Sequence, residues 1–139
     1  AGRPAPGKST AARPADRAVL TVTAQPMALG APPLEASFAA MGTYFQTEAG
    51  RAALSRAGKA GSVTVHSASS VGDVFYIQIS DQSAARDLPV EPRYWRAILE
   101  IKGTMLTLTV QALAGARIPD ADQRALLEDF VRRIKQENR

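Results

Sequence analysis

The chain has 139 residues, of which 45% are hydrophobic and 22% are charged, and its formal net charge is +4. This length and composition fit one globular domain. The sequence has no cysteine, one histidine and no apolar run of about 18 residues, which excludes disulfides, thiolate or multi-histidine metal sites and a membrane-spanning helix within it.

Basic residues are concentrated at the N-terminal end. Residues 1–17 carry a net charge of +3, which leaves +1 for the other 122 residues. Proline, glycine and small residues dominate 1–16, so we predict a flexible leader there and a single domain over 17–139. Weak peripheral contact with an anionic membrane through this tail is one hypothesis, and it involves Arg3, Lys8, Arg13 and Arg17.

The first residues also bear on location. The chain starts with Ala1 and a small-residue segment, which is typical of an exported protein after signal-peptide cleavage. An interdomain linker has the same composition, so a mature protein and an excised domain of a larger membrane protein both stay open. We expect a periplasmic or otherwise exported protein.

The first half of the domain reads as a strand followed by helices. Alternating β-branched residues predict a strand over 17–24, and three prolines with a glycine predict a loop over 25–33. Apolar residues at helical spacing predict a helical region over 34–57, in which Thr47 caps a second short helix that ends near Gly58. For its aromatic cluster we favour helix core over an exposed docking face; the cluster is Met41, Tyr44 and Phe45.

A hairpin follows. We predict strands over 61–68 and 73–80, joined by a turn of about five residues at 69–73. In the second strand, one face carries Phe75, Ile77 and Ile79, and the opposite face carries Val74, Tyr76, Gln78 and Ser80. The polar segment 81–93 contains two prolines, and we expect it to be the longest internal loop.

The clearest pattern is YWRAILEI-KG-TMLTLTVQ over 94–111. Lys102-Gly103 predicts a two-residue hairpin turn. That turn sets Leu99 opposite Leu106 and Trp95 opposite Val110, so the paired large apolar side chains share one face.

The chain ends in a predicted loop over 112–119 and a helix from Asp120 to about Glu137. We expect Asp120 to cap this helix together with Gln123 in a capping box. Its predicted buried stripe is Leu127, Phe130, Val131 and Ile134. Two ion pairs are expected on its exposed side, Glu128–Arg132 and Asp129–Arg133. The order β-α-β-β-β-β-α predicts an α+β fold, an antiparallel sheet of about five strands with helices packed on it.

Candidate chemistry is sparse. Histidine is the side chain that titrates near neutral pH without perturbation, so a hydrolase or lyase that uses His66 with Ser69, Ser70 or Asp73 is one hypothesis. A half-exposed structural histidine is the interpretation we favour. The carboxylate pairs Asp120/Asp122 and Asp81/Asp87 fit a helix cap and a loop better than a paired acid site, and the sequence has no phosphate-binding loop. We therefore expect no catalytic residue, no metal and no cofactor.

One surface is the best candidate for recognition. If Trp95 faces inward, Tyr94 and Arg96 face outward, and Tyr76 can lie on the same face of the sheet. Our candidate partner-binding residues are therefore Tyr76, Tyr94 and Arg96. The simpler interpretation is that Trp95 is an anchor of the core and that this segment has no recognition role. We expect no specific nucleic-acid partner.

The second half resembles the Mog1/PsbP-like class of small α/β proteins in layout. The matching parts are GDVFYIQISD (72–81), a polar loop, YWRAILEIKGTMLTLTVQA (94–112) and a closing helix. The resemblance implies a sheet flanked by helices, a non-enzymatic binding, assembly or adaptor role, and frequent export in bacteria. It transfers no functional residue, because the class has no shared catalytic site. Our leading hypothesis is an exported, non-enzymatic binding or assembly module that acts through a protein partner.

Overall fold

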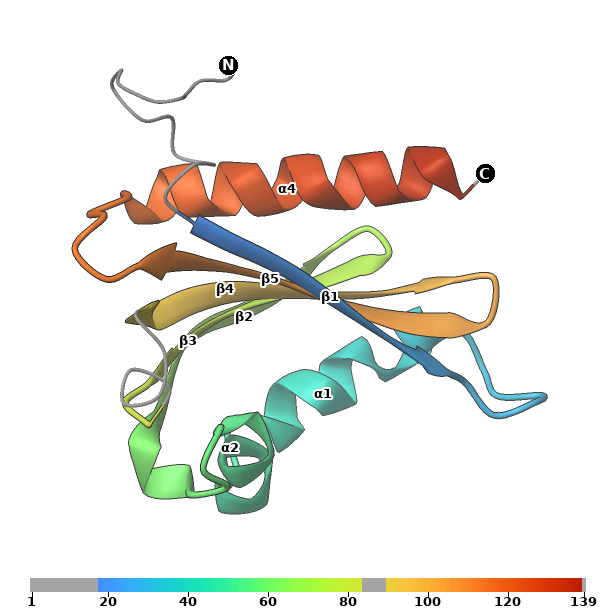
Figure 1. Ribbon diagram of the computed structural model, residues 1–139. Helices are drawn as coiled ribbons and strands as arrows, with labels where there is room; N and C mark the ends of the chain where they lie inside the picture. Colours follow the sequence, from blue (N-terminus) through green and yellow to red (C-terminus); the bar gives the residue numbers. More distant parts are fainter. Residues whose placement is uncertain (1–17, 84–89, 139) are drawn as a thin grey trace, which may run out of the picture.

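A five-stranded antiparallel sheet forms the centre of the molecule (Figure 1). The computed structural model describes residues 18–83 and 90–138. The strands are β1 (Ala18–Pro26), β2 (Val63–Val71), β3 (Val74–Asp81), β4 (Val90–Ile101) and β5 (Thr104–Leu113). Their order in the sheet is β1-β5-β4-β3-β2, so β1 and β2 form its two edges. The predicted α+β class with a five-stranded antiparallel sheet is confirmed.

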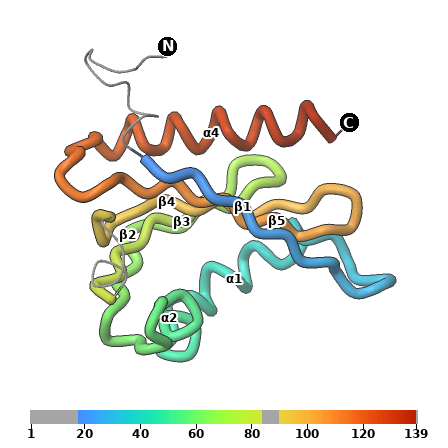
Figure 2. The backbone as a smooth tube through the Cα atoms, in the orientation of Figure 1, coloured from blue at the N-terminus to red at the C-terminus, as the bar shows by residue number. Residues whose placement is uncertain are grey.

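Helices lie on both faces of this sheet. The long helix α4 (Asp120–Glu137) crosses one face, whereas short helices occupy the other face (Figures 1 and 2). The short helices are η2 (Leu34–Ser37), α1 (Phe38–Tyr44), α2 (Glu48–Leu54) and η3 (Ala60–Ser62). Each layer has its own apolar core, because strands β3 and β4 bury side chains on both faces.

The β4–β5 hairpin has the predicted register. Leu99 is opposite Leu106, and Trp95 is opposite Val110. Lys102 and Gly103 both have positive φ, 51° and 77°, as the two central residues of a type I′ turn require. The apolar face of the hairpin packs beneath α4, where Leu99, Leu108 and Leu127 are fully buried.

The helical region between β1 and β2 is divided, as predicted, at Thr47. The Thr47 hydroxyl accepts a hydrogen bond of 3.0 Å from the Gly50 N–H and so caps α2. A Cβ atom on Gly50 would lie 1.9 Å from the carbonyl oxygen of Tyr44. The close approach of α1 and α2 therefore requires glycine at this position.

Two strand boundaries differ from the prediction by three residues or more. The β2–β3 turn consists of Gly72 and Asp73 rather than about five residues, because β2 continues to Val71. Strand β4 starts at Val90 rather than at Tyr94. Its pairing with β5 is irregular between these two residues, which accommodates Pro92 despite its missing N–H.

The start of α4 also differs from the prediction. Pro119 is the N-cap, Asp120 is the first helical residue, and no side chain caps the helix. Gln123 is buried and its amide donates a 2.8 Å hydrogen bond to the Ile118 carbonyl, so it anchors the preceding loop instead of completing a capping box. Leu127 and Val131 are buried as predicted, with Phe130 and Ile134 partly buried beside them.

The expected ion pairs on α4 are half right. Asp129 pairs with Arg133 at 3.0 Å and also with Arg132. Glu128 pairs with Arg124 at 3.4 Å rather than with Arg132.

Within the described residues, no helix is long and apolar enough to span a bilayer.

Candidate binding site

The face with the short helices is only partly covered. Its buried residues come from β2, β3, β4 and the helices themselves, whereas nearly all of β1 is exposed. The strand register places polar side chains over the open part of this face. On β1 and β5 they are Thr21, Thr23, Gln25, Thr107, Thr109 and Gln111.

A groove of about 500 Å³ lies between this open part of the sheet and the end of α2. Its apolar walls are Val19, Leu54, Val90 and Leu113. Three charged side chains, Arg56, Asp81 and Arg96, line it together with Tyr94 and with Thr21, Thr109 and Gln111. This combination of apolar walls with a few converging polar groups is typical of a binding site.

Arg96 lies near the middle of the sheet, in one cross-strand row with Thr21 and Thr109. Its guanidinium lies over the Tyr94 ring, 5.6 Å from the centroid, and donates a 3.3 Å hydrogen bond to the Tyr94 hydroxyl. Its Nε is buried and has no hydrogen-bond partner within the described residues. A buried N–H of a cation without an acceptor is costly, so the hydrogen-bonding capacity of this guanidinium is not filled by the described residues.

Asp81 anchors the helical side of the groove. It is 1% exposed and accepts hydrogen bonds from the Arg56 N–H (2.7 Å), the Ser62 hydroxyl (2.9 Å), and the N–H and hydroxyl of Ser83 (3.0 and 2.6 Å). Burial acts to raise the pKa of Asp81, but the hydrogen bonds from Ser83, Arg56 and Ser62 outweigh it and lower the pKa below the usual value. Asp81 is therefore an ionised structural anchor whose oxygens are already occupied.

Tyr94 is buried between these two charges. Burial raises the pKa of its hydroxyl, Arg96 acts to lower the pKa, and Asp81 acts to raise it. The hydroxyl stays protonated at neutral pH, so Tyr94 can orient the guanidinium of Arg96 but is not a base.

The structure separates the three residues predicted to share one face. Tyr94 and Arg96 lie on the groove face, whereas Tyr76 pairs with Ala97 and lies buried beneath α4. Arg124 of α4 covers the Tyr76 ring at 4.8 Å. The shared face is therefore wrong for Tyr76, because both faces of β3 are apolar and its pattern does not say which helix covers which face.

His66 does not meet the predicted partners. Its Nε2 lies 2.6 Å from the Ser80 hydroxyl on the neighbouring strand, at the irregularity in pairing between Val65 and Ser67. Asp73 instead pairs with Lys135 at 2.5 Å. The His66 ring is exposed, and neither it nor Ser80 lines any of the hollows described in this section.

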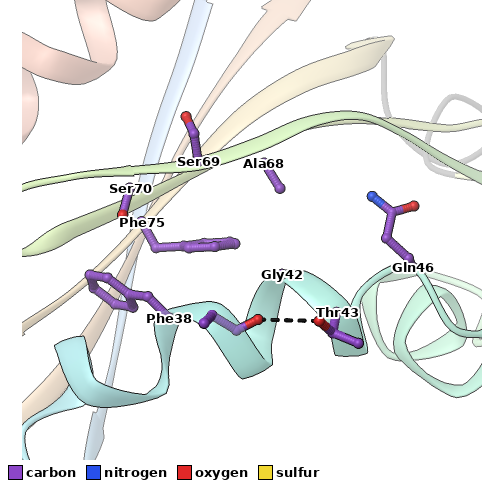
Figure 3. A pocket seen from close by; sticks show the side chains of 9 residues that line it. Phe38, Gly42, Thr43, Gln46, Ala68, Ser69, Ser70 and Phe75 are labelled. Carbon is purple, nitrogen blue, oxygen red and sulfur yellow. Dashed lines mark hydrogen bonds between the residues drawn. The ribbon is translucent and has the colours of Figure 1, made fainter.

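Ser69 and Ser70 line a second, wide hollow of about 600 Å³ between α1 and β2. Figure 3 shows Phe38 and Phe75 at its apolar end and Thr43 and Gln46 on its helical side. Its lining carries no charged side chain. A third hollow of about 170 Å³ lies beside Glu35, Asp73, Glu100 and Lys102, and Glu100 there accepts a 2.9 Å hydrogen bond from the Leu34 N–H.

The remaining acidic residues have structural neighbours. Asp120 lies 3.5 Å from Arg93, and Asp87 lies outside the described residues. In the described part of the chain, no three His, Asp or Glu side chains are grouped so as to hold a metal ion. The role of Asp81 was not predicted from the sequence, although the spacing Asp81-x-Ser83 at a strand end was the available signal.

Comparisons with family models, with curated proteins and with solved structures found no match to this chain. The resemblance to the Mog1/PsbP-like class therefore stays a prediction.

Proposed function

We propose that this chain is a non-enzymatic binding module that acts through a protein partner, and that its groove takes a carboxylate of that partner. The observation that supports this proposal most strongly concerns Arg96. It is a cation at the groove floor, and its buried Nε has no acceptor within the described residues. A carboxylate matches the planar donor fork of a guanidinium, and a bidentate pair satisfies two N–H groups at once.

The groove walls indicate what should accompany the carboxylate. Leu54, Val90 and Leu113 present apolar surface around the charged centre. Asp81 is not the hydrogen-bond acceptor for Arg96, because its oxygens accept hydrogen bonds from Arg56, Ser62 and Ser83 instead. The favoured ligand is a chain end or acidic side chain of the partner beside a medium-sized apolar residue.

The test is an NMR titration with N-acetyl-leucine and, as the matched neutral probe, N-acetyl-leucinamide. We expect the acid to shift the amide resonances of groove residues such as Thr109, with a dissociation constant of about 1 mM for so small a ligand. The amide should produce at least tenfold weaker binding. Arg96→Gln should abolish the difference, whereas Arg93→Gln, which changes an exposed arginine on the same strand, should preserve it. Equal shifts with acid and amide, or unchanged binding in Arg96→Gln, would contradict the proposal.

A protein partner is tested separately with a photocrosslinking residue at Ala53, an exposed residue of α2 that lines the groove away from the β1 edge. Crosslinked partners should disappear in the Arg96→Gln background and on addition of excess N-acetyl-leucine. Crosslinking that survives both changes would place the partner elsewhere.

The contact between His66 and Ser80 supports a second candidate, a serine hydrolase. A histidine within hydrogen-bond reach of a hydroxyl is the first requirement for an activated serine. A fluorophosphonate probe should then label the protein, and Ser80→Ala and His66→Ala should each abolish labelling. Absence of labelling in the unmodified protein would remove this candidate.

Two further proposals from the sequence concern location. Export to the periplasm is tested by osmotic-shock fractionation of cells that express the full-length gene. The basic residues 3, 8, 13 and 17 lie outside the described part of the chain. Deletion of residues 1–17 should reduce retention on anionic vesicles if this segment contacts membranes.

A further inference from the structure

Strand β1 carries no charged residue, and among residues 18–83 and 90–138 no strand pairs with its outer edge. Its sequence is AVLTVTAQP, and its exposed apolar side chains include Val19 (38%), Leu20 (41%) and Val22 (46%). Edge strands usually carry charges, bulges or a covering segment that prevent pairing with another chain. The pairing of β1 with β5 runs from Ala18 to Pro26 without a register shift.

The last hydrogen bond between β1 and β5 shows which backbone N–H and C=O groups of β1 point toward β5 and which point toward the open edge. The Met27 N–H donates a 2.9 Å hydrogen bond to the Gly103 carbonyl, which continues the β1–β5 pairing. Because alternate residues of a strand direct their N–H and C=O groups to the same side, the odd-numbered residues of β1 bond to β5. Ala18, Leu20, Val22 and Ala24 therefore direct their backbone groups to the open edge, together with Pro26, whose missing N–H is tolerated there.

The same residues are apolar, and their side chains lie on the α4 face. Val22 is opposite Leu108 and Leu20 is opposite Val110, and both of these β5 residues belong to the core beneath α4. On α4, Arg124 reaches the rings of β3 and β4, and Lys135 reaches the β2–β3 turn. Helical spacing then places Leu126 and Phe130, which are partly buried, on the flank toward β1. The residues of this edge and the neighbouring flank of α4 are thus both apolar.

We propose that a second copy of this chain pairs along β1, antiparallel and centred on Val22, to form one continuous sheet across two protomers. This register uses the full strand and sets Val22 against the partner's Val22, and Leu20 against the partner's Ala24. Thr21 then lies opposite the partner's Thr23, a favourable cross-strand pair. The near-palindrome Thr21-Val22-Thr23 and the absence of charge make the edge complementary to itself, as a twofold interface requires.

The other edge is less suited to this pairing. Strand β2 has a register shift between Val65 and Ser67, which twists the strand locally. It still offers a matched control, because Val71 near its end is a more exposed valine (57%) than Val22.

Sedimentation equilibrium of the 139-residue chain, from about 1 µM to about 1 mM, tests the proposal. We expect a reversible monomer–dimer equilibrium. Val22→Lys and Val22→Glu should each weaken the dimer at least tenfold, because each sets like charges against each other at the twofold axis. Val71→Lys should leave the equilibrium unchanged.

Mixing the two Val22 variants gives the sharpest result. Opposite charges now meet at the axis, so equimolar Val22→Lys and Val22→Glu should recover a heterodimer, which native mass spectrometry distinguishes by mass. Circular dichroism of each variant checks that it is folded. If Val22→Lys does not fold, Val22→Pro replaces it, because the N–H that it removes faces the open edge.

Three results would overturn the proposal: a monomer throughout the concentration range, a dimer insensitive to Val22→Lys, or no heterodimer on mixing folded variants. None of them affects the groove, which is tested by binding of N-acetyl-leucine and by Arg96→Gln. The two proposals therefore fail independently.

Discussion

The two faces of the sheet bury the same strands in different ways. Beneath α4, one 18-residue helix covers the middle strands, and the side chains at Leu99, Leu108, Val110 and Leu127 are fully buried. On the other face, α1 and α2 have seven residues each and leave β1 and β5 open. The first face is therefore organised for stability, and the second leaves room for a groove.

Polar anchoring differs in the same way. The face with the short helices depends on the hydrogen bonds of Asp81, which hold the end of α2. The α4 face depends on apolar packing, supported by Arg124 over the rings of Tyr76 and Trp95. Substitutions on the two faces should therefore change the free energy of unfolding by different amounts, and these changes should depend differently on pH and salt.

The largest effect is expected for Leu127→Ala on the α4 face. Leu127 is completely buried against β4 and β5, so its truncation leaves a cavity and should lower the free energy of unfolding by about 3–4 kcal/mol. Urea denaturation followed by far-UV circular dichroism measures this change. The matched control is Leu126→Ala, since Leu126 is only partly buried on the same helix and should lose less than half as much. Similar losses at both positions would contradict the tight packing inferred for α4.

Asp81→Asn should have the next largest effect, about 2–3 kcal/mol at pH 7. The amide loses the charge-assisted hydrogen bonds and leaves buried donors without good acceptors. The folded-state pKa of Asp81 is lowered, so its ionised form stabilises the fold above the ordinary aspartate pKa of about 3.9. That contribution is lost as the pH falls through the folded-state pKa.

Unfolding curves at several pH values check the sign. The stability difference between the unmodified protein and Asp81→Asn should be constant from about pH 6 to pH 8 and should shrink below about pH 4. Asp120→Asn is the control, because that carboxylate is exposed beside Arg93 and its removal should change stability little. A difference that grows toward acidic pH would show that the sign assigned to Asp81 is wrong.

These contrasts show what the sequence could and could not predict. The β4–β5 hairpin was predictable, because Lys102-Gly103 fixes the turn and a one-residue slip would expose Trp95 and Leu99. The side of Tyr76 was not predictable, because β3 is apolar on both faces and the sequence between β3 and β4 contains no two-residue turn motif that would set the register of their pairing. The groove was not predictable either, because it depends on how far α2 extends over the sheet. In the sequence, Arg96 is indistinguishable from any other outward-facing residue of a strand.

Arg124→Gln is expected to cost about 1 kcal/mol. Its guanidinium lies 4.8 Å from the centroid of the Tyr76 ring and 5.0 Å from that of Trp95. The emission of Trp95, the only tryptophan, should also change as the ring loses its cover. Arg133→Gln removes an arginine that contacts Asp129 only at the surface and should change neither property. An unchanged emission spectrum in Arg124→Gln would show that the stacking does not persist in solution.

The smallest effect is expected for the ion pair between Lys135 and Asp73, which joins the last turns of α4 to the β2–β3 turn at 2.5 Å. Both side chains are substantially exposed, so water and salt screen their attraction. A double-mutant cycle with Lys135→Met and Asp73→Asn should give a coupling energy of at most about 0.5 kcal/mol, which disappears at about 1 M salt. A coupling well above about 1 kcal/mol would mean that this turn supports α4 as strongly as the packing of its apolar stripe, and the stability of the α4 face would no longer be explained by burial alone.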